Sequence, residues 1–302
     1  MNTAAKLSAY GVALALVAGG GWGIGTAVGP FSGAAGVHGE EDAGHGDAHS
    51  GTVAEAANTD QPGGLASSRG AYTLTPTSTT LTPGTTNPFA FRITGPDGAA
   101  VTAFDVEHEK RMHFIVVRRD TAGYQHLHPQ LGPDGTWTVP LPVKEAGSYR
   151  AFADYTPAGG SGTTLGVDLV APGDFRPVAH PGSRLATVDG YQVRLTGDLV
   201  PGRASKVTAT VTRNGAEITD LQPYLGAYGH LVALRQGDLA YLHVHPDGAP
   251  GDGKTAAGPA VNFFAEVPSA GGYRLFLDFR HGGAVHTAEF TVSTTAQERN
   301  GS

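Results

Sequence analysis

One pattern of histidines occurs twice in this chain and restricts what the chain can fold into. The stretches MHFIVVRRDTAGYQHLHP (112–129) and GHLVALRQGDLAYLHVHP (229–246) both contain H-x12-H-x-H-P, at a constant offset of 117 residues. In each stretch two short apolar runs flank a polar segment with glycine, which predicts a β-hairpin. Gly237 and Asp238, a favoured turn pair, lie at the centre of the second copy.

The hairpin predicts where the histidines lie. With that turn, His230 lies opposite His245, and His243 is two positions away from His245 on the same strand. Alternate residues of a strand share one face, and paired Cβ atoms on antiparallel strands are ~4.5–5.5 Å apart. Three imidazoles therefore gather on one face of the sheet. The same spacing in the first copy predicts a second trio: His113, His126 and His128.

The duplication covers a whole domain. GSYRAFADY (147–155) matches GGYRLFLDF (271–279), so that Asp154 and Asp278 occupy equivalent positions. Gly 45 and Pro 20 make up more than a fifth of the 302 residues, and strand-like runs alternate with turns, which is typical of an all-β sandwich. We therefore expect an all-β protein with two tandem sandwich domains. Their expected limits are 71–172 and 191–293, with a Pro-rich connection at 173–190 and a loose tail at 294–302.

The N-terminal segment is predicted to be a membrane anchor. No charged residue occurs between Leu7 and Val37, and about 20 apolar residues are enough to cross a bilayer as a helix. We expect residues 1–30 to span the membrane once and residues 31–302 to lie outside the cytoplasm. A cleaved signal peptide is the alternative.

Residues 31–70 are poor in large apolar side chains and are predicted to form a disordered linker. The linker contains VHGEEDAGHGDAHS, in which three histidines and four carboxylates alternate: His38, His45, His49, Glu40, Glu41, Asp42 and Asp47. Flexible tracts of this kind bind divalent metals loosely. The alternative is an acidic segment that only confers solubility.

Several classes of chemistry are excluded by composition. The chain has no cysteine, and Met1 and Met112 are its only methionines, so disulfides, thiolate catalysis and Cys-type zinc sites are ruled out. Any bound metal must be held by imidazole and carboxylate, which favours Cu(II), Zn(II) or Ni(II) over Cu(I). The net charge of −7, without a run of Lys and Arg, argues against a nucleic-acid partner.

The two trios are the candidate metal ligands. An H-x-H pair with one cross-strand histidine supplies three nitrogen ligands for Cu(II) or Zn(II), and the fourth can be water or a carboxylate. Asp154 and Asp278 are the carboxylate candidates. Further candidates of lower rank are His108, His281 and His286. Binding is expected to weaken as pH falls through ~6.5, because protonated imidazole cannot bind a metal.

Other interpretations stay open. Both faces of FIVV and LVAL are apolar, which favours central strands. The steps His128-Pro129 and His245-Pro246 can end strands, with imidazoles bonded to backbone carbonyls, and the protein is then a structural or interaction module of the cell envelope. We do not expect an enzyme, because no G-x-S-x-G, Walker or H-E-x-x-H motif occurs. A metal-dependent hydrolase is the least favoured reading.

The segments MHFIVVRRD, YQHLHP, DGTW and GSYRAFADY resemble those of exported, membrane-anchored actinobacterial proteins with duplicated domains that carry this hairpin. They are also similar to immunoglobulin-like or cupredoxin-like envelope domains associated with copper and other heavy metals. The resemblance covers about residues 72–293. It implies a β-sandwich and an envelope location, and points to metal handling, which we interpret as sequestration or delivery. The identity of an envelope protein partner stays open. Typical copper carriers of the envelope combine Met with His, and the presence of Met112 alone departs from that pattern.

Overall fold

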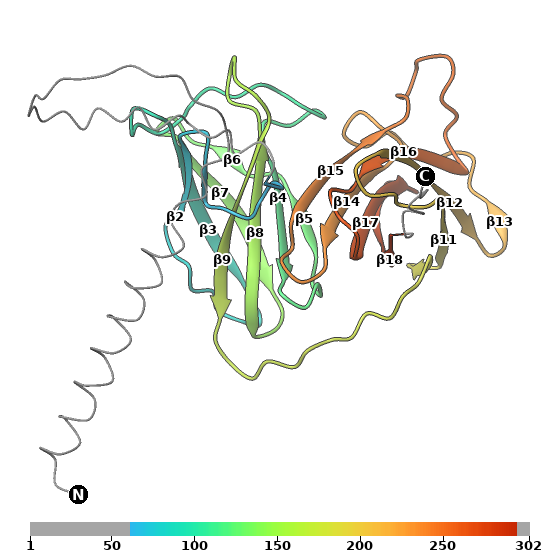
Figure 1. Ribbon diagram of the computed structural model, residues 1–302, viewed down its shortest axis with the longest axis horizontal. Helices are drawn as coiled ribbons and strands as arrows, with labels where there is room; N and C mark the ends of the chain where they lie inside the picture. The colour runs from blue at the N-terminus through green and yellow to red at the C-terminus, as the bar shows by residue number, and fades with distance from the viewer. Residues whose placement is uncertain (1–60, 295–302) are drawn as a thin grey trace, which may run out of the picture. The chain divides into compact units, whose positions relative to one another are not determined.

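The computed structural model describes residues 61–294 (Figure 1). Within this range the chain forms strands and turns and no helix, which confirms the all-β prediction. Correspondingly, no helix in this part of the chain has the length and apolar character needed to cross a membrane. The predicted anchor, most of the predicted linker and nearly all of the tail lie outside the described residues.

The first sandwich consists of two antiparallel sheets. Their strand orders are β1-β2-β3-β7-β6 and β5-β4-β8-β9. The strands are β1 (Ser68–Arg69), β2 (Tyr72–Pro76), β3 (Thr85–Thr94), β4 (His113–Arg118), β5 (Gln125–Leu127), β6 (Gln130–Leu131), β7 (Thr136–Val143), β8 (Gly147–Tyr155) and β9 (Thr163–Ala171). Aromatic rings fill the space between the sheets, with Phe91 and Phe114 stacked at 4.8 Å between ring centroids.

The second sandwich repeats this plan with one change. Its strands are β10 (Leu185–Val188), β11 (Tyr191–Thr196), β12 (Ala204–Arg213), β13 (Ala216–Glu217), β14 (His230–Arg235), β15 (Tyr241–Pro246), β16 (Ala260–Glu266), β17 (Gly272–His281) and β18 (Ala284–Ser293). Here β15 pairs with both β14 and β16, so the two halves join into one nine-stranded sheet. The core between the halves includes Tyr191, Phe263 and Phe290.

The His-Pro step marks the end of the hairpin strand in both copies. In the first copy β5 pairs with β4, and after His128-Pro129 the chain continues as β6, which pairs with β7 of the other sheet. Proline has no N–H to donate to a ladder, so this is where the chain changes sheets. In the second copy β15 ends at Pro246.

Two segments that we expected outside the domains belong to the sandwiches instead. Residues 185–188, in the expected connection, form β10 and pair with β11. In the expected linker, β1 pairs with β2, and Gly63 forms a bridge with Tyr241 of the second sandwich. The disorder prediction is therefore wrong for residues 61–70. Residues 61–70 have Leu65 as their one large apolar side chain, and backbone pairing contributes to holding this segment in place.

The two sandwiches belong to one compact unit of the chain and share a buried cluster. On β4, Phe114 and Val116 face the core of the first sandwich, whereas Ile115 and Val117 belong to this shared cluster. We call the cluster the interdomain layer; its residues are Ile115, Val117, Phe152, Val232, Leu234, Leu239, Tyr241 and Phe276, with Tyr124 packed against them. The second apolar face of FIVV and LVAL is thus explained by contact between domains.

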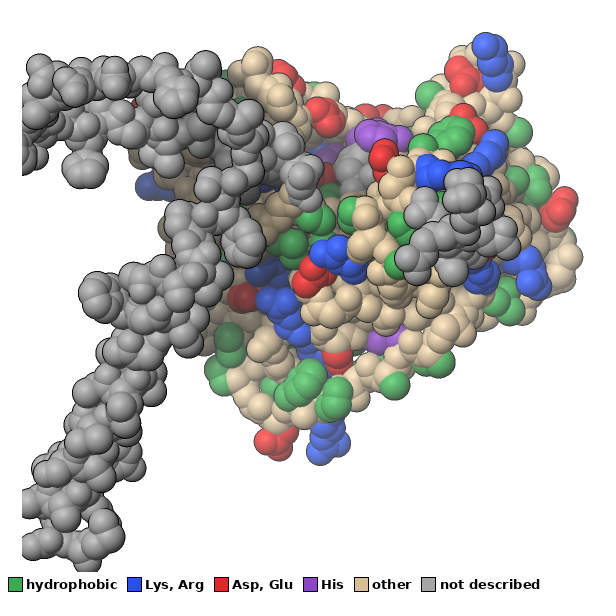
Figure 2. All heavy atoms as spheres, viewed as in Figure 1, with side chains coloured by type: hydrophobic (Ala, Val, Ile, Leu, Met, Phe, Trp, Pro, Cys, Tyr) green, Lys and Arg blue, Asp and Glu red, His purple; other side chains and the backbone are tan. Residues whose placement is uncertain are grey.

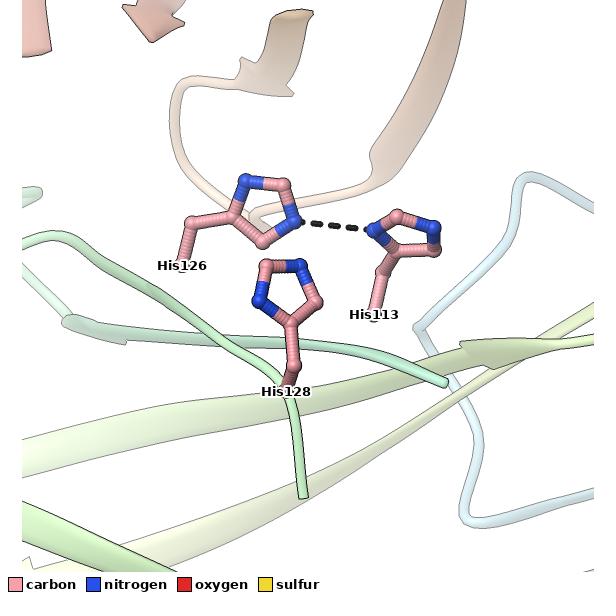
Figure 3. A group of neighbouring side chains, drawn as sticks. All are labelled: His113, His126 and His128. Carbon is pink, nitrogen blue, oxygen red and sulfur yellow. Dashed lines mark hydrogen bonds between the residues drawn. The ribbon is translucent and has the colours of Figure 1, made fainter. Parts of the chain in front are cut away.

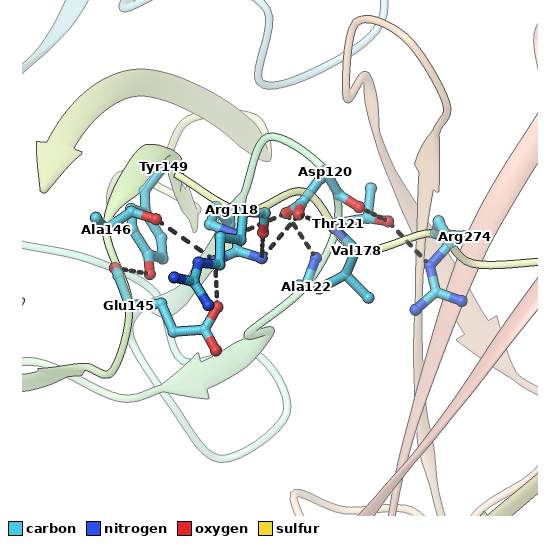
Figure 4. A network of polar contacts seen from close by, with 10 residues as sticks. Arg118, Asp120, Thr121, Ala122, Glu145, Ala146, Tyr149, Val178 and Arg274 are labelled. Carbon is cyan, nitrogen blue, oxygen red and sulfur yellow. Dashed lines mark hydrogen bonds and ion pairs between the residues drawn. The ribbon is translucent and has the colours of Figure 1, made fainter. Parts of the chain in front are cut away.

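Polar contacts flank the interdomain layer along the strands. On β8 the pairs with β4 run from Asp154 opposite His113 to Arg150 opposite Val117. Arg274, the counterpart of Arg150 on β17, donates from Nε to Thr121 Oγ1 in the first sandwich at 3.1 Å (Figure 4). The layer therefore has histidines and aspartates at one end and arginines at the other.

Candidate metal centre

The hairpins pair in the expected register. In the first, Ile115 lies opposite His126 and Phe114 opposite Leu127, which makes His113 and His128 the next residues in line. The loop of the second is wider than a two-residue turn, because Arg235 N donates to Ala240 O at 3.0 Å and leaves residues 236–239 as the loop. The central position predicted for Gly237 and Asp238 is correct.

His113, His126 and His128 come together on the face of the first sandwich that carries the interdomain layer (Figure 3). One ring nitrogen from each lies within 4.8 Å of the others. The shortest contact joins His113 Nδ1 to His126 Nε2, at 3.0 Å. Nitrogen ligands ~2.0–2.1 Å from one ion lie ~3–4 Å apart, so a small rotation of the side chains would let the trio enclose an ion.

Partners outside the trio fix the protons on two of the rings. His113 Nε2 lies 3.1 Å from the carbonyl oxygen of Glu107, and His126 Nδ1 lies 2.8 Å from Oδ2 of Asp278. Carbonyl and carboxylate oxygens only accept, so both of these outer nitrogens donate. In the neutral rings the nitrogens that face each other across 3.0 Å then both carry lone pairs. Only a positive charge between them satisfies this arrangement.

Burial keeps two rings of the trio, those of His113 and His128, uncharged at neutral pH. Desolvation, followed by the nearby His126, lowers the pKa of His113 to about 4. Desolvation, followed by His126 and His113, lowers the pKa of His128 to about 3. His128 Nε2 is in addition buried without a hydrogen-bond partner. Neutral imidazole is the form that binds a metal ion, so these rings are in the binding form at pH 7.

His230 and His108 lie beside the trio. His230 is buried, and its Nε2 donates to the carbonyl oxygen of Leu225 at 2.9 Å. Its ring centroid is 6.3 Å from that of His113 and 5.0 Å from that of His108. His230 therefore approaches the trio of the first copy. Burial, the largest cause, lowers its pKa to about 3.

The trio of the second copy stays a prediction. His245 is exposed and lies opposite Phe264 on the neighbouring strand. The backbone of His243 pairs with Val232, and its side chain lies outside what the structure describes. Among the described side chains, His113, His126 and His128 are the one group of three that could hold a metal ion.

His281 and His286 bind other partners. Each lies against an exposed aspartate of the second sandwich: His281 Nε2 is 3.1 Å from Asp220, and His286 Nδ1 is 2.7 Å from Asp189. These two histidines, which we ranked as additional ligands, are not part of the group of three.

Asp154 and Asp278 each accept a hydrogen bond from the opposite sandwich. Asp278 accepts from His126 Nδ1 and, at 2.6 Å, from Thr287 Oγ1 of its own sandwich. Asp154 accepts from the Tyr241 hydroxyl at 3.1 Å and from Thr164 Oγ1 at 2.8 Å. Neither carboxylate belongs to the group of potential ligands. Asp278 instead contacts a ligand side chain.

Two tyrosines and two carbonyl groups of this region were not predicted from the sequence. Tyr124 and Tyr241 each stand two residues before an H-x-H pair, at the same offset of 117 residues, and this repetition was the available signal. The oxygens that orient His113 and His230 belong to the backbone of Glu107 and Leu225. No residue type signals a backbone contact.

Histidine side chains reach the surface on the face drawn in Figure 2, with acidic side chains beside them. Basic and acidic side chains are interspersed over the rest of that face.

The strands and the repeated hairpin define a tandem of two β-sandwich domains. The chain belongs to the family described as Domain of unknown function (DUF8832), whose model matches it twice, at residues 66–171 and 186–296. No curated protein matches the sequence.

Several solved structures are similar at low identity. The Escherichia coli adhesin FdeC has 11% identity and a TM-score of 0.25, over 76% of this chain and 65% of that chain. The Ig1-2 module of the Drosophila receptor protein tyrosine phosphatase DLAR has 8% identity and a TM-score of 0.20, over 74% and 99%. The D00-D0 domain of intimin has 12% identity and a TM-score of 0.22, over 74% and 100%. The chain thus spans slightly less than two thirds of the FdeC chain.

Proposed function

We propose that the protein binds a divalent transition metal ion, Cu(II) or Zn(II), through His113, His126 and His128, for sequestration or delivery. One observation carries the proposal: His113 Nδ1 and His126 Nε2 face each other at 3.0 Å while both outer nitrogens donate elsewhere. Because desolvation lowers the pKa of His113 to about 4, the ring of His113 does not carry the missing positive charge at pH 7. A metal ion between the two nitrogens would supply it.

Three imidazoles suit both Cu(II) and Zn(II). Tetragonal sites are typical of Cu(II) and tetrahedral sites of Zn(II), and we propose either ion at this trio.

An ion can reach the trio by way of His128. This side chain lines a hollow of about 500 Å³ on the first sandwich, together with Phe89, Val139 and residues of the neighbouring strands. We propose binding and no catalysis, because the Asp278 carboxylate, a potential general base beside the trio, is already bonded to His126.

The location outside the cytoplasm is part of the same proposal. The uncharged N-terminal segment and the resemblance of the hairpin to exported metal-associated domains support a membrane-tethered protein. The histidine and carboxylate tract between residues 38 and 49 would then collect the same ion weakly.

Calorimetric titration of the full chain with Cu(II) and with Zn(II) tests the proposal. Wild type should show one tight site, and the pair His126→Ala and His128→Ala should abolish it. The matched control is the pair His281→Ala and His286→Ala, two histidines of the second sandwich with other partners, which should leave the tight site intact. A wild-type chain without a tight site would refute the proposal.

A structural role for the histidines is the second candidate. The bond from His126 Nδ1 to Asp278 favours it, because this bond joins the two sandwiches. In that case the substitutions at His126 and His128 lower stability in a protein that has no tight metal site. The wild-type titration separates the two candidates.

A further inference from the structure

We propose that Asp278 of the second sandwich is a positioning residue for the metal centre of the first, so that ion binding and docking of the two sandwiches are coupled. This inference rests on the proposed metal binding and extends it to the regulation of that site. It gives the second copy of the domain a part in the function of the first.

His126 has two sides. Its Nε2 faces His113 within the trio, and its Nδ1 donates to Asp278 Oδ2 at 2.8 Å. The two side chains are only 5% and 4% exposed. A histidine that binds a metal usually passes its other N–H to a carboxylate or carbonyl, which fixes the ring and raises its basicity. His113 obtains such a partner from its own sandwich, Glu107, whereas the partner of His126 comes from the other one.

Asp278 is held firmly within the second sandwich. Its backbone pairs with His230 on β14 and with Thr287 on β18, and the Thr287 hydroxyl donates to Oδ1 at 2.6 Å. The carboxylate therefore has a fixed place in that sandwich. It can orient His126 only while the two sandwiches are docked.

The same two strands carry the apolar contact between the domains. Tyr124 precedes His126 by two residues, Phe276 precedes Asp278 by two, and their rings stack at 4.0 Å between centroids. The ring stack and the His–Asp bond thus lie side by side in one contact. Separation of the sandwiches would break both together.

The charges of the ion and of Asp278 make the coupling favourable, so that ion binding and docking strengthen each other. A buried carboxylate is costly without a compensating charge, and an ion bound at His126 Nε2 would strengthen the bond from Nδ1–H to Asp278. Coupling between two binding events is reciprocal. If Asp278 strengthens ion binding, the ion strengthens docking by the same factor.

Zinc titration of the full chain, with zinc chloride as the probe, tests the role of Asp278. Asp278→Asn should weaken the tight site 10–100-fold, and Asp278→Glu should restore part of the affinity. The matched control is Asp189→Asn, which removes a carboxylate that binds another histidine Nδ1, that of His286, at 2.7 Å. It should leave zinc affinity unchanged.

Hydrogen exchange of the backbone amides in β17 supplies the second readout. Zinc should slow this exchange in wild type, since β17 belongs to the second sandwich and carries Asp278 and Phe276, and should not slow it in Asp278→Asn. A residue that only stabilised the fold would change exchange without metal and leave the zinc-dependent difference intact.

The outcomes separate the two proposals. Wild type without a tight zinc site overturns the metal proposal and this inference with it. A tight site that is equally strong in Asp278→Asn overturns this inference alone. If Asp278→Asn fails to fold, the wild-type measurements are sufficient, because tight zinc binding without any zinc-dependent slowing of exchange in β17 also overturns the inference.

Discussion

Nδ1 of His126 in the first sandwich donates a hydrogen bond to Oδ2 of Asp278 in the second, at 2.8 Å, and both side chains are buried. The two residues are 152 positions apart in the chain. Through this bond a candidate metal ligand of one domain depends on a carboxylate of the other.

Removal of either member should destabilise the protein, because the other is left buried without its partner. His126→Ala and Asp278→Ala should each lower the free energy of unfolding by about 2–5 kcal/mol. The double variant should cost less than the sum, with a coupling of about 0.5–3 kcal/mol. Urea unfolding without metal measures the free energy of unfolding of wild type, the two single variants and the double variant. Additive costs would show that the bond contributes nothing.

Stability should fall in mild acid. The pKa of His113 is about 4 and that of His230 about 3 in the folded protein, against ~6.5 in the unfolded chain. Below pH ~6.5 the unfolded chain therefore binds more protons, and stability decreases by up to about 1.4 kcal/mol per pH unit for each histidine. Above pH ~7 this contribution is fully present. Unfolding in urea with a chelator between pH 8 and 4.5 measures the slope, and His230→Gln should reduce it.

Metal binding should resist acid more than the sequence suggested. Ordinary imidazoles lose metal as pH falls below ~6.5, but His113 and His128 stay neutral until pH approaches their pKa values of about 4 and 3. Zinc affinity of the full chain should therefore persist at pH 5. A peptide of residues 38–49 is the control, with histidines of the same chain in a short isolated segment. Parallel loss of zinc by both would contradict the prediction.

Phe276→Ala should loosen the interdomain layer. The ring is fully buried and stacks on Tyr124, so its truncation should cost about 3–5 kcal/mol. Phe264→Ala, at a ring 43% exposed, should cost less than about 1 kcal/mol. Thermal or urea unfolding compares the two variants. Equal costs would mean that the layer does not stabilise the protein.

Gly166→Ala should displace the segment that precedes β1. A Cβ at this position would lie 2.0 Å from the carbonyl oxygen of Gly64, an oxygen that accepts from Arg150 Nε at 3.1 Å. We expect the free energy of unfolding to fall by about 2 kcal/mol or more. We also expect faster proteolysis within residues 61–67. Gly70→Ala, with nothing within 4 Å of its Cβ, should cost about 1 kcal/mol, because its φ is positive. Proteolysis of the Gly166 variant at the wild-type rate would refute this role of the segment.

The local part of the site could be predicted from the sequence. His113, His126 and His128 share one face because side chains of a strand alternate with a period of two residues and because the loop has a fixed length. The spacing in H-x12-H-x-H-P determines both. The sandwiches followed from composition and turn spacing for the same reason, since they depend on short-range patterns.

The contacts between the copies could not be predicted in this way. We expected one patch in each domain, because nothing local indicates that Asp278 reaches His126 or that Tyr241 reaches Asp154. The apolar second face of FIVV and LVAL was the available clue. The apolar residues on that face predicted burial. A strand face buried inside one sandwich and a face buried against another sandwich have the same apolar sequence pattern, so the sequence does not distinguish them.

The interdomain layer joins equivalent residues of the two copies, as Ile115 with Val232 and Phe152 with Phe276 illustrate. An interface made from the same patch on both partners is the kind that two identical subunits form around a two-fold axis. In a homodimer every substitution appears twice, so the two halves must keep the same contacts. A gene that encodes both halves in one chain has no such constraint. Its two aspartates can diverge, one to hold an imidazole and the other a tyrosine.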